Sequence, residues 1–350
     1  MYPGIFAATH PDRPAVIQAE TGEVITYAQL HDQALRLSNV LRAAGFVPGD
    51  HIAICMENNT RYLEVIWGCH YAGLVYTACS SRLTKAEITY IINDCAAKGF
   101  ITSKYKADQA QDIVNDIPNV HLRLMIGGTI PGYDSYESTV DSASSEEPAN
   151  MIDGTDMLYS SGTTGMPKGV ARPFPGTPLG TASGLSQLLT VGLYGFSDAM
   201  VYLSPAPLYH AAPLRFNMSV HGIGGTTVVM EHFDAEDYLK YAEKYKASHT
   251  QVVPTMFIRM LKLEDAVRNK YDVSSLKVAI HAAAPCPVAT KHAMINWWGP
   301  IIREYYAGTE GNGFVYCNSD MWLAHPGTVG TAIQGIIHIC DEEGNEQPTG

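Results

Sequence analysis

The stretch Tyr159-Ser160-Ser161-Gly162-Thr163-Thr164-Gly165-Met166-Pro167-Lys168-Gly169-Val170 is the most informative part of this chain. It combines four serine and threonine hydroxyls with three glycines and one lysine. Glycines let a backbone approach a ligand closely, and successive N–H groups in such a turn form a concave anion site. Hydroxyls and a lysine add hydrogen-bond donors and a positive charge. The stretch therefore predicts a loop that binds a polyphosphate.

This loop differs from the common nucleotide-binding P-loop, G-x-x-x-x-G-K-[ST], whose lysine opens a helix. Here Pro167 precedes Lys168, and Gly169 takes the position of the metal-binding hydroxyl. Because a proline disfavours helical geometry at the residue before it, we expect the loop not to lead directly into a helix. The alternative is an exposed Gly/Ser/Thr-rich linker. The apolar, strand-like entry to the loop and its single basic residue argue against that alternative.

The loop resembles the signature loop of the adenylate-forming superfamily, which comprises acyl-CoA synthetases, peptide-synthetase adenylation domains and firefly luciferase. Later segments are similar, in order, to that family's acyl-gate motif, its Gly-Gly-Ala-Pro adenine segment, its Tyr-Gly-x-Thr-Glu motif and its Gly-x-x-Gly entry to the next subdomain. These segments are Pro207-Leu208-Tyr209-His210, Ala282-Ala283-Ala284-Pro285, Tyr305-Tyr306-Ala307-Gly308-Thr309-Glu310-Gly311 and Gly327-Thr328-Val329-Gly330. Ala307 and Ala282–Ala284 depart from the glycines common in the family, and we expect one methyl group at each to crowd the nucleotide slightly.

Composition limits the classes of partner. The chain has 350 residues, of which 46% are hydrophobic, and its net charge of −12 opposes nucleic-acid binding. The seven cysteines have no C-x-x-C spacing, which favours reduced thiols and a cytoplasmic protein over disulfides or zinc. Neither a signal peptide nor a run of 18 apolar residues is present in the sequence, so we expect no integral membrane segment. Peripheral contact with a membrane and a homodimer stay open.

Helical and strand patterns alternate along the chain. Thr26 with Gln29, and later Thr84 with Glu87, read as capping boxes at helix starts, and Gly45 as the end of the first helix. Alternation of this kind predicts parallel sheets covered by helices on both faces. We expect strands at 51–56, 74–78, 100–102, 122–126, 157–160, 200–203, 226–230, 250–253, 277–280 and 301–305, and helices at 234–246, 255–263 and 287–298.

The resemblance implies an α/β fold of two stacked, parallel-type sheets with helices, in the layer order αβαβα, followed by the start of a small β-barrel. On this basis the whole chain, 1–350, is an N-terminal adenylation domain, with the first sheet in 45–195, the second sheet in 1–44 and 196–325, and the barrel starting at 326–350. The acidic, Ser-rich stretch 141–150 reads as a surface linker. A turn signal at 341–345 lies where the family continues, so we expect the mobile C-terminal domain, with its catalytic lysine, to be absent and this fragment to have little activity alone.

The resemblance also implies a reaction and its residues. An acid is joined to the α-phosphate of ATP, and the acyl-adenylate then forms a thioester with coenzyme A, with Mg²⁺ as the cation. Lys168, Thr164, Thr309 and Glu310 would act in catalysis, with Glu310 and Thr164 on the metal and His210 at the acyl group. The residues that would hold the nucleotide are Ser160, Ser161, Gly162, Thr163, Gly165, Ala283, Ala284, Pro285 and Tyr306.

Several alternatives remain at this point. The acceptor of the acyl group is CoA or a carrier protein, and a non-catalytic nucleotide-binding homologue is a third hypothesis. His210 is a gate at the acyl pocket, a donor to the substrate carboxylate, or a buried, hydrogen-bonded histidine. For the acid we favour medium to long fatty acids or bulky alicyclic acids, because many residues in 205–225 and 280–310 are apolar.

Overall fold

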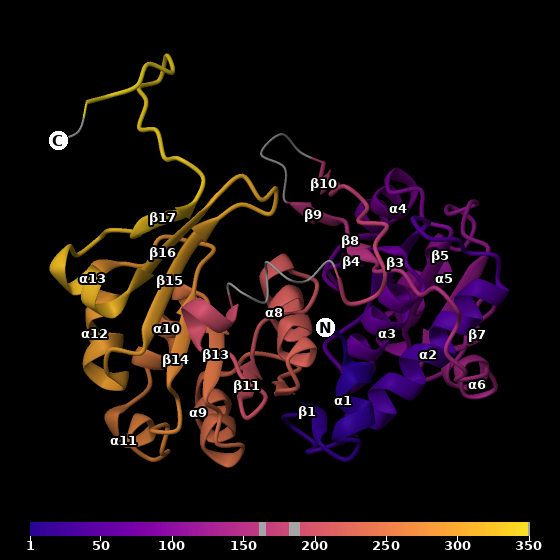
Figure 1. The fold of residues 1–350 in the computed structure, drawn as a ribbon, viewed down its shortest axis with the longest axis horizontal. Helices are drawn as coiled ribbons and strands as arrows, with labels where there is room; N and C mark the ends of the chain where they lie inside the picture. Colours follow the sequence, from indigo (N-terminus) through magenta and orange to yellow (C-terminus); the bar gives the residue numbers. More distant parts are fainter. Residues whose placement is uncertain (161–165, 182–189, 349–350) are drawn as a thin grey trace.

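The fold is built around two large sheets. A computed structural model describes residues 1–160, 166–181 and 190–348. Within these residues the strands form a six-stranded sheet, a nine-stranded sheet and a two-stranded hairpin. Figure 1 shows the six-stranded sheet in the indigo to magenta lobe and most of the nine-stranded sheet in the orange to yellow lobe, with β1 of the latter sheet in indigo. None of the helices in these described ranges is long and apolar enough to cross a membrane.

The six-stranded sheet has the order β7-β6-β5-β3-β4-β8, and all of its strand pairs are parallel. Every residue of β4 and β5 is buried, as expected for a parallel sheet covered on both faces. The strands are β3 (His51–Cys55), β4 (Val75–Cys79), β5 (Gly99–Ser103), β6 (Leu122–Ile126), β7 (Asp134–Ser135) and β8 (Thr155–Asp156). The helices around it are α2 (Tyr27–Ala43), α3 (Thr60–Tyr71), α4 (Lys85–Asp94), the short η1 (Lys104–Lys106), α5 (Ala107–Ile113) and α6 (Tyr136–Asp141).

The nine-stranded sheet has the order β17-β16-β15-β14-β13-β11-β12-β1-β2. It is parallel from β15 to β1, and β2, β16 and β17 are antiparallel at its edges. Its strands are β1 (Pro14–Gln18), β2 (Val24–Thr26), β11 (Val201–Ser204), β12 (Thr226–Val229), β13 (His249–Val252), β14 (Val278–His281), β15 (Ile302–Ala307), β16 (Phe314–Asn318) and β17 (Thr331–Gln334). Its helices are α1 (Pro3–Thr9), α8 (Ala211–Gly222), α9 (Ala235–Lys244), α10 (Pro254–Leu261), α11 (Asp265–Arg268), α12 (Val288–Trp298) and α13 (Ser319–Ala324).

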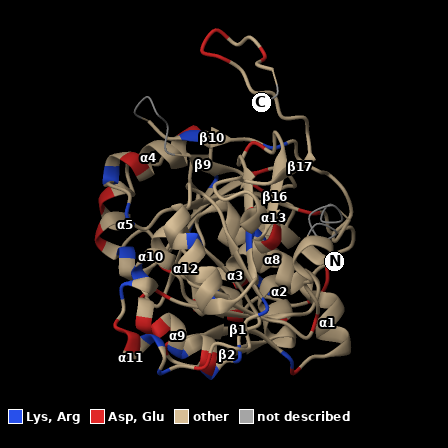
Figure 2. Ribbon diagram, turned by 90° about the vertical axis from the view of Figure 1, so that its left-hand side faces the viewer, with Lys and Arg blue, Asp and Glu red and all other residues tan. Residues whose placement is uncertain are grey.

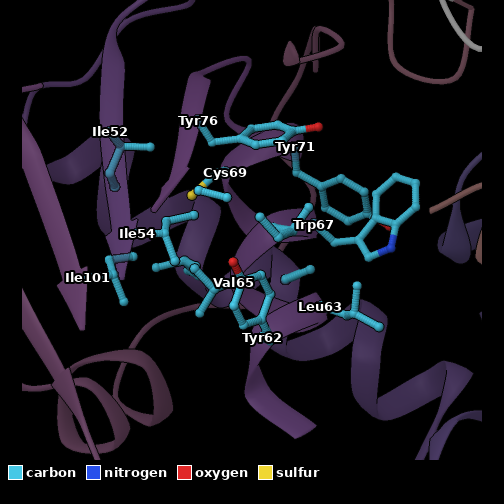
Figure 3. Close-up of a cluster of buried hydrophobic side chains, with 14 of the residues drawn as sticks. Ile52, Ile54, Tyr62, Leu63, Val65, Trp67, Cys69, Tyr71, Tyr76 and Ile101 are labelled. Carbon is cyan, nitrogen blue, oxygen red and sulfur yellow. The ribbon is translucent and has the colours of Figure 1, made fainter. Parts of the chain in front are cut away.

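Buried clusters define the layers. The largest cluster joins α2, α3 and α8 to strands of both sheets, through side chains such as Leu37, Trp67, Val16 and Leu214. Figure 3 shows part of it, with Trp67 and Tyr71 of α3 beside Tyr76 of β4. A second cluster packs α4 and α5 on the outer face of the first sheet, and a third packs α9, α10 and α12 on the second. The predicted αβαβα order is therefore confirmed, with α2, α3 and α8 as its middle layer.

The local signals in the sequence are confirmed. Thr26 and Thr84 each form a capping box at the start of α2 and α4, and Gly45 follows α2 with a φ of 88°. The predicted strands and helices agree with the structure to within one or two residues at most ends. No prediction was made for the remaining described elements, which are α1, β1, β2, η1, α5, β7, α6, β8, β10 (Lys168–Val170), α8, α11, β16, α13 and β17.

The C-terminal segment leaves the second sheet. After the edge strand β17, residues 335–348 extend away from both lobes, as Figure 1 shows in yellow. The predicted turn at 341–345 is present, since the N–H of Gly344 donates to the carbonyl of Asp341 at 3.1 Å. Ile336 and Ile339, on either side of His338, are 84% and 67% exposed. Figure 2 shows basic and acidic residues interspersed along the outer helices α4, α5, α9 and α11 on the face in view.

Polar side chains join the two sheets. Asn58, just after β3, donates to the carbonyls of Ala206 at 3.1 Å and Met230 at 2.9 Å, and accepts from the N–H of Leu208 at 2.9 Å. These three partners follow the carboxyl ends of β11 and β12. Asn58 therefore fixes the carboxyl end of one sheet against that of the other. Ligands in open α/β sheets bind at such carboxyl ends.

Candidate active site

The lysine of the glycine-rich stretch lies in a β-hairpin. β9 (Leu158–Ser160) pairs with β10 (Lys168–Val170) in antiparallel fashion, with Lys168 opposite Ser160. Tyr159 docks this hairpin on α4 by donating from its hydroxyl to Asp94 at 2.5 Å, and burial together with that carboxylate raises the pKa of Tyr159. The expectation that the loop does not lead directly into a helix is confirmed. Lys168 is exposed, and the predicted residues Ser161, Gly162, Thr163, Thr164 and Gly165 lie outside the described residues.

The two tyrosines near the end of β15 point to opposite faces of the strand. Tyr305 is turned into the protein, where its ring stacks on Phe216 with centroids 6.1 Å apart and its hydroxyl accepts from Gln251 at 2.8 Å. Tyr306 is 67% exposed. A large aromatic ring on the surface at a strand end is available to stack on a planar ligand. The adenine-stacking role of Tyr306 stays a prediction.

Two oxygen ligands converge in the turn after β15. A Cβ atom added to Gly308 would lie 2.8 Å from Oε2 of Glu310 and 2.9 Å from Oδ1 of Asn312, so both oxygens face the same small space. Mg²⁺ binds oxygen atoms, and in nucleotide sites it takes one or two from the protein and the rest from phosphates and water. The pair fits such an ion. The described residues contain no cluster of three or more His, Cys, Asp and Glu side chains that would hold a metal without a nucleotide.

A surface groove of about 200 Å³ lies beside this turn. It runs between the ends of β15 and β16 and the segment that follows β17. Its lining residues are Tyr306, Ala307, Gly308, Asn312, Gly313, Phe314, Val315, Gln334, Gly335, Ile336 and Ile337. Figures 1 and 2 both place this turn and the β9–β10 hairpin at the upper end of the molecule. Among the described residues, no ion pair joins Lys168 to Glu310.

The predicted adenine segment follows β14, the strand that pairs with β15. His281 and Ala282 are buried, while Ala283, Ala284 and Pro285 are exposed. Ala283 has a φ of 76°, a left-handed conformation that costs an L-residue about 1–2 kcal/mol and that glycine adopts freely. The backbone at Ala283 is therefore strained, because this residue has a Cβ atom where glycine has none. The sequence analysis expected crowding of the nucleotide and did not predict this backbone strain. The segment lies one strand away from Tyr306, since β14 and β15 are hydrogen-bonded neighbours.

His210 precedes the first residue of α8. Its side chain forms no capping hydrogen bond, and its ring lies 4.2 Å from that of Tyr209 between centroids. Although the residue is exposed, the surrounding chain desolvates the imidazole and lowers its pKa below 6.5. The alternative of a buried, hydrogen-bonded histidine is wrong. The structure brings His210 to the carboxyl end of β11, where Leu208 is held by Asn58.

Three functional candidates were not predicted from the sequence. Asn312 shares the space over Gly308 with Glu310, and its closeness to Glu310 in the sequence was the one available signal. Arg215 of α8 forms a bidentate ion pair with Asp156 of β8, at 3.1 and 2.7 Å, across the interface between the sheets. Their separation of 59 residues gives no local pattern from which this pair could be inferred.

A family model described as "AMP-binding enzyme" matches residues 5–350. 4-Coumarate–CoA ligase 2 of Petroselinum crispum is 28% identical over 282 residues, covering 78% of this chain and 50% of the relative. Fatty acid–[acyl-carrier-protein] ligase ScoC of Streptomyces coeruleorubidus is 27% identical, covering 99% of this chain and 66% of the relative. The chain thus spans about half to two thirds of the length of these curated relatives.

Solved structures share the fold. The N-terminal domain of FACL13 from Mycobacterium tuberculosis superposes with a TM-score of 0.82 at 24% identity, covering 99% of this chain and 85% of that one. MbtA of Mycobacterium smegmatis superposes with a TM-score of 0.85 at 23% identity, covering 99% of this chain and 64% of that one. Because the family model spans nearly the whole sequence and the fold agrees over nearly its whole length, the chain belongs to the family of AMP-binding enzymes.

Proposed function

We propose that this protein activates a carboxylic acid with ATP and transfers the acyl group to coenzyme A. The observation that carries the proposal is the grouping of a lysine-bearing hairpin, an exposed aromatic ring and a pair of oxygen ligands at one end of the molecule. The residues concerned are Lys168, Tyr306, Glu310 and Asn312. The names of the relatives, which include CoA ligases and a ligase for an acyl carrier protein, support this assignment.

The first half-reaction joins two anions. A carboxylate oxygen attacks the α-phosphorus of ATP, a new P–O bond forms, and the bond to pyrophosphate breaks. In the proposal, Lys168 and Ser160, with Ser161, Gly162, Thr163 and Gly165, hold the triphosphate so that the two anions meet in line. Tyr306 stacks on the adenine, which lies against Ala283, Ala284 and Pro285.

The second half-reaction is an acyl transfer. The thiol of CoA attacks the acyl carbon, the bond to AMP breaks, and a thioester forms. Glu310 and Asn312, with Thr164, are the proposed oxygen ligands for Mg²⁺, which neutralises phosphate charge when bound. Thr309 is proposed to act in catalysis next to Glu310. His210 is proposed to face the acyl group from the start of α8. The proposed acid is a medium or long fatty acid or a bulky alicyclic acid.

Acid-dependent exchange of labelled pyrophosphate into ATP tests the first half-reaction, with a panel of carboxylic acids and the full-length protein. We expect exchange with at least one acid, and no exchange without an acid. Absence of exchange with every class of acid would contradict the proposal and favour a nucleotide-binding protein without catalysis.

A carrier protein is the second candidate for the acyl acceptor. The relative ScoC, named for its action on an acyl carrier protein, matches 99% of this chain and supports this candidate. Incubating the activated acid with free CoA and, separately, with a phosphopantetheinylated carrier protein distinguishes the two. Thioester on CoA supports the main proposal, and thioester on the carrier alone supports the second.

A further inference from the structure

A buried ion pair joins α12 to β15, the strand that carries Tyr306 near its end. Lys291, in the first turn of α12, donates from Nζ to Oε2 of Glu304 on β15. Lys291 is fully buried and Glu304 is 6% exposed. The shell around the pair is apolar and aromatic, with the ring of Trp322 5.2 Å from the Lys291 ammonium. The proposed function uses neither residue.

The same carboxylate faces the end of the neighbouring strand. His281, the last residue of β14, is the register partner of Glu304, and its Nε2 lies 3.6 Å from Oε2 of Glu304. The His281 ring is fully buried against Phe257, with centroids 5.6 Å apart. Among the described residues, neither of its nitrogens has a hydrogen-bond partner. Burial and the nearby Lys291 lower the pKa of His281 to about 3, so the ring is neutral at physiological pH.

The connection between these anchors is strained. The chain runs from His281 through Ala282, Ala283, Ala284 and Pro285 to α12. Its first end is held beside Glu304 by the pairing of β14 with β15, and its far end is held by the ion pair of Lys291 with Glu304. Within this short connection Ala283 has a φ of 76°. A non-glycine residue persists in that region only where its surroundings determine the backbone conformation. The clamped ends of the connection provide that constraint.

Stability alone does not account for the ion pair. Burying two charges is expensive, and replacing a buried pair by apolar side chains of similar volume is often neutral or stabilising. The pair also lies close in sequence to the residues of the proposed adenine site. Glu304 lies two residues before Tyr306 on β15, and His281 lies immediately before the alanine segment on β14. The pair and the histidine therefore lie on the two neighbouring strands that carry the walls of the proposed adenine site.

We propose that Lys291, Glu304 and His281 are positioning residues that hold Ala283 in its left-handed conformation and thereby set the width of the adenine site. This inference rests on the proposed function. The residues do not touch the nucleotide, and they act through the backbone of the alanine segment. Without the cluster, Ala283 relaxes to a negative φ, and the segment no longer lies opposite the ring of Tyr306.

The test is calorimetric binding of AMP to the wild type and to Lys291→Met/Glu304→Leu, which removes both charges and leaves neither unpaired. We expect affinity for AMP to fall roughly 5- to 30-fold, the equilibrium equivalent of the strain of one left-handed L-residue. The matched control is Arg61→Met/Glu64→Leu, which removes a 2.9 Å ion pair with an equally buried carboxylate in α3. The control should bind AMP as the wild type does. Thermal unfolding of each variant shows that the comparison is between folded proteins.

Ala283→Gly provides the decisive second arm. Glycine adopts a φ of this kind without strain. Ala283→Gly, added to Lys291→Met/Glu304→Leu (the charge-free variant), should therefore restore most of the lost affinity for AMP. Unchanged AMP affinity in the charge-free variant would overturn the inference, as would an equal loss with and without Ala283→Gly. If the double variant does not fold, AMP binding is measured instead on Glu304→Gln, with and without Ala283→Gly. Glu304→Gln keeps an acceptor oxygen for Lys291. A wild type that binds no AMP would overturn the proposed function itself, which distinguishes the two failures.

Discussion

Lys168 is exposed at the start of β10, opposite Ser160, where its ammonium is available to a phosphate. Lys168→Ala removes a charge-assisted contact of roughly 1.5–3 kcal/mol, so we expect ATP affinity and pyrophosphate exchange to fall about ten- to a hundredfold. Lys240→Ala, on the exposed side of α9, is the control and should leave both unchanged. Wild-type exchange in Lys168→Ala would remove this lysine from the site.

Glu310 shares the space over Gly308 with Asn312. Glu310→Gln keeps the size of the side chain and removes its negative charge, which Mg²⁺ prefers among its ligands. We expect the rate at saturating ATP to fall and the Mg²⁺ concentration for half-maximal exchange to rise, with an unchanged melting temperature. If the Mg²⁺ dependence of the variant matches that of the wild type, Glu310 is not a ligand of the ion.

His210 is exposed before α8 and forms no capping bond. His210→Ala therefore removes no hydrogen bond from the fold, and the melting temperature should stay close to that of the wild type. The preference among acids of different length should shift, by about 1–3 kcal/mol per methylene at most, because apolar contacts discriminate weakly. A profile of acids measured on the variant checks this. An unaltered profile would remove His210 from the acyl site.

At the scale of single elements, the imidazole of His221 makes α8 sensitive to acid. His221 is fully buried, its Nδ1 accepts from Trp67 of α3 at 3.0 Å, and its Nε2 lies 3.1 Å from the carbonyl of Ala15 in β1. Burial lowers its pKa from 6.5 to about 4. Between these values the unfolded chain binds a proton that the folded chain does not.

The free energy of unfolding should therefore fall as the pH decreases from 6.5 towards 4, by up to about 1.4 kcal/mol per pH unit from this one histidine. His281, whose pKa is lowered to about 3, adds to the same loss. Urea denaturation at a series of pH values measures the slope. His221→Gln, which keeps one donor and one acceptor, should have a shallower slope, and equal slopes in the two proteins would contradict the assignment.

Elements were predictable from the sequence where their signals are local. The capping boxes of Thr26 and Thr84 involve residues three positions apart, and both helices start where the sequence indicates. The antiparallel strands β16 and β17 follow β15 without intervening long helices. Because the strand predictions relied on an alternation of strands and helices, these two strands were not expected. In the site, the motif residues Tyr306 and Glu310 lie in one turn. The left-handed conformation of Ala283 has no signal in the sequence, because alanine is not a residue that favours it.

At the scale of the whole molecule, Asn58 holds the two sheets together by three hydrogen bonds. Asn58→Leu leaves two buried carbonyls and one N–H without a partner, each costing roughly 1–3 kcal/mol. We expect a clear fall in the free energy of unfolding, measured by urea denaturation. Asn59→Leu is the matched control, because within the described part of the chain the side chain of Asn59 bonds only to Glu57 and Met56 of its own segment. If the two substitutions lower the free energy of unfolding equally, the hydrogen bonds between the sheets are not the cause of the destabilisation.

The parallel pairing of β1 with β12 also sets the order of events on the ribosome. The six-stranded sheet comes from one continuous stretch, β3 to β8, and can form as soon as that stretch has emerged. The carbonyl of Ala15, in contrast, accepts from the hydroxyl of Thr227, which lies 212 positions later. At a synthesis rate of roughly 5–20 residues per second, about 10–40 s pass between the synthesis of β1 and that of its partner strand β12. Throughout that time the nascent chain presents the open edge of an apolar strand, which is the segment that a chaperone or a neighbouring nascent chain would bind first.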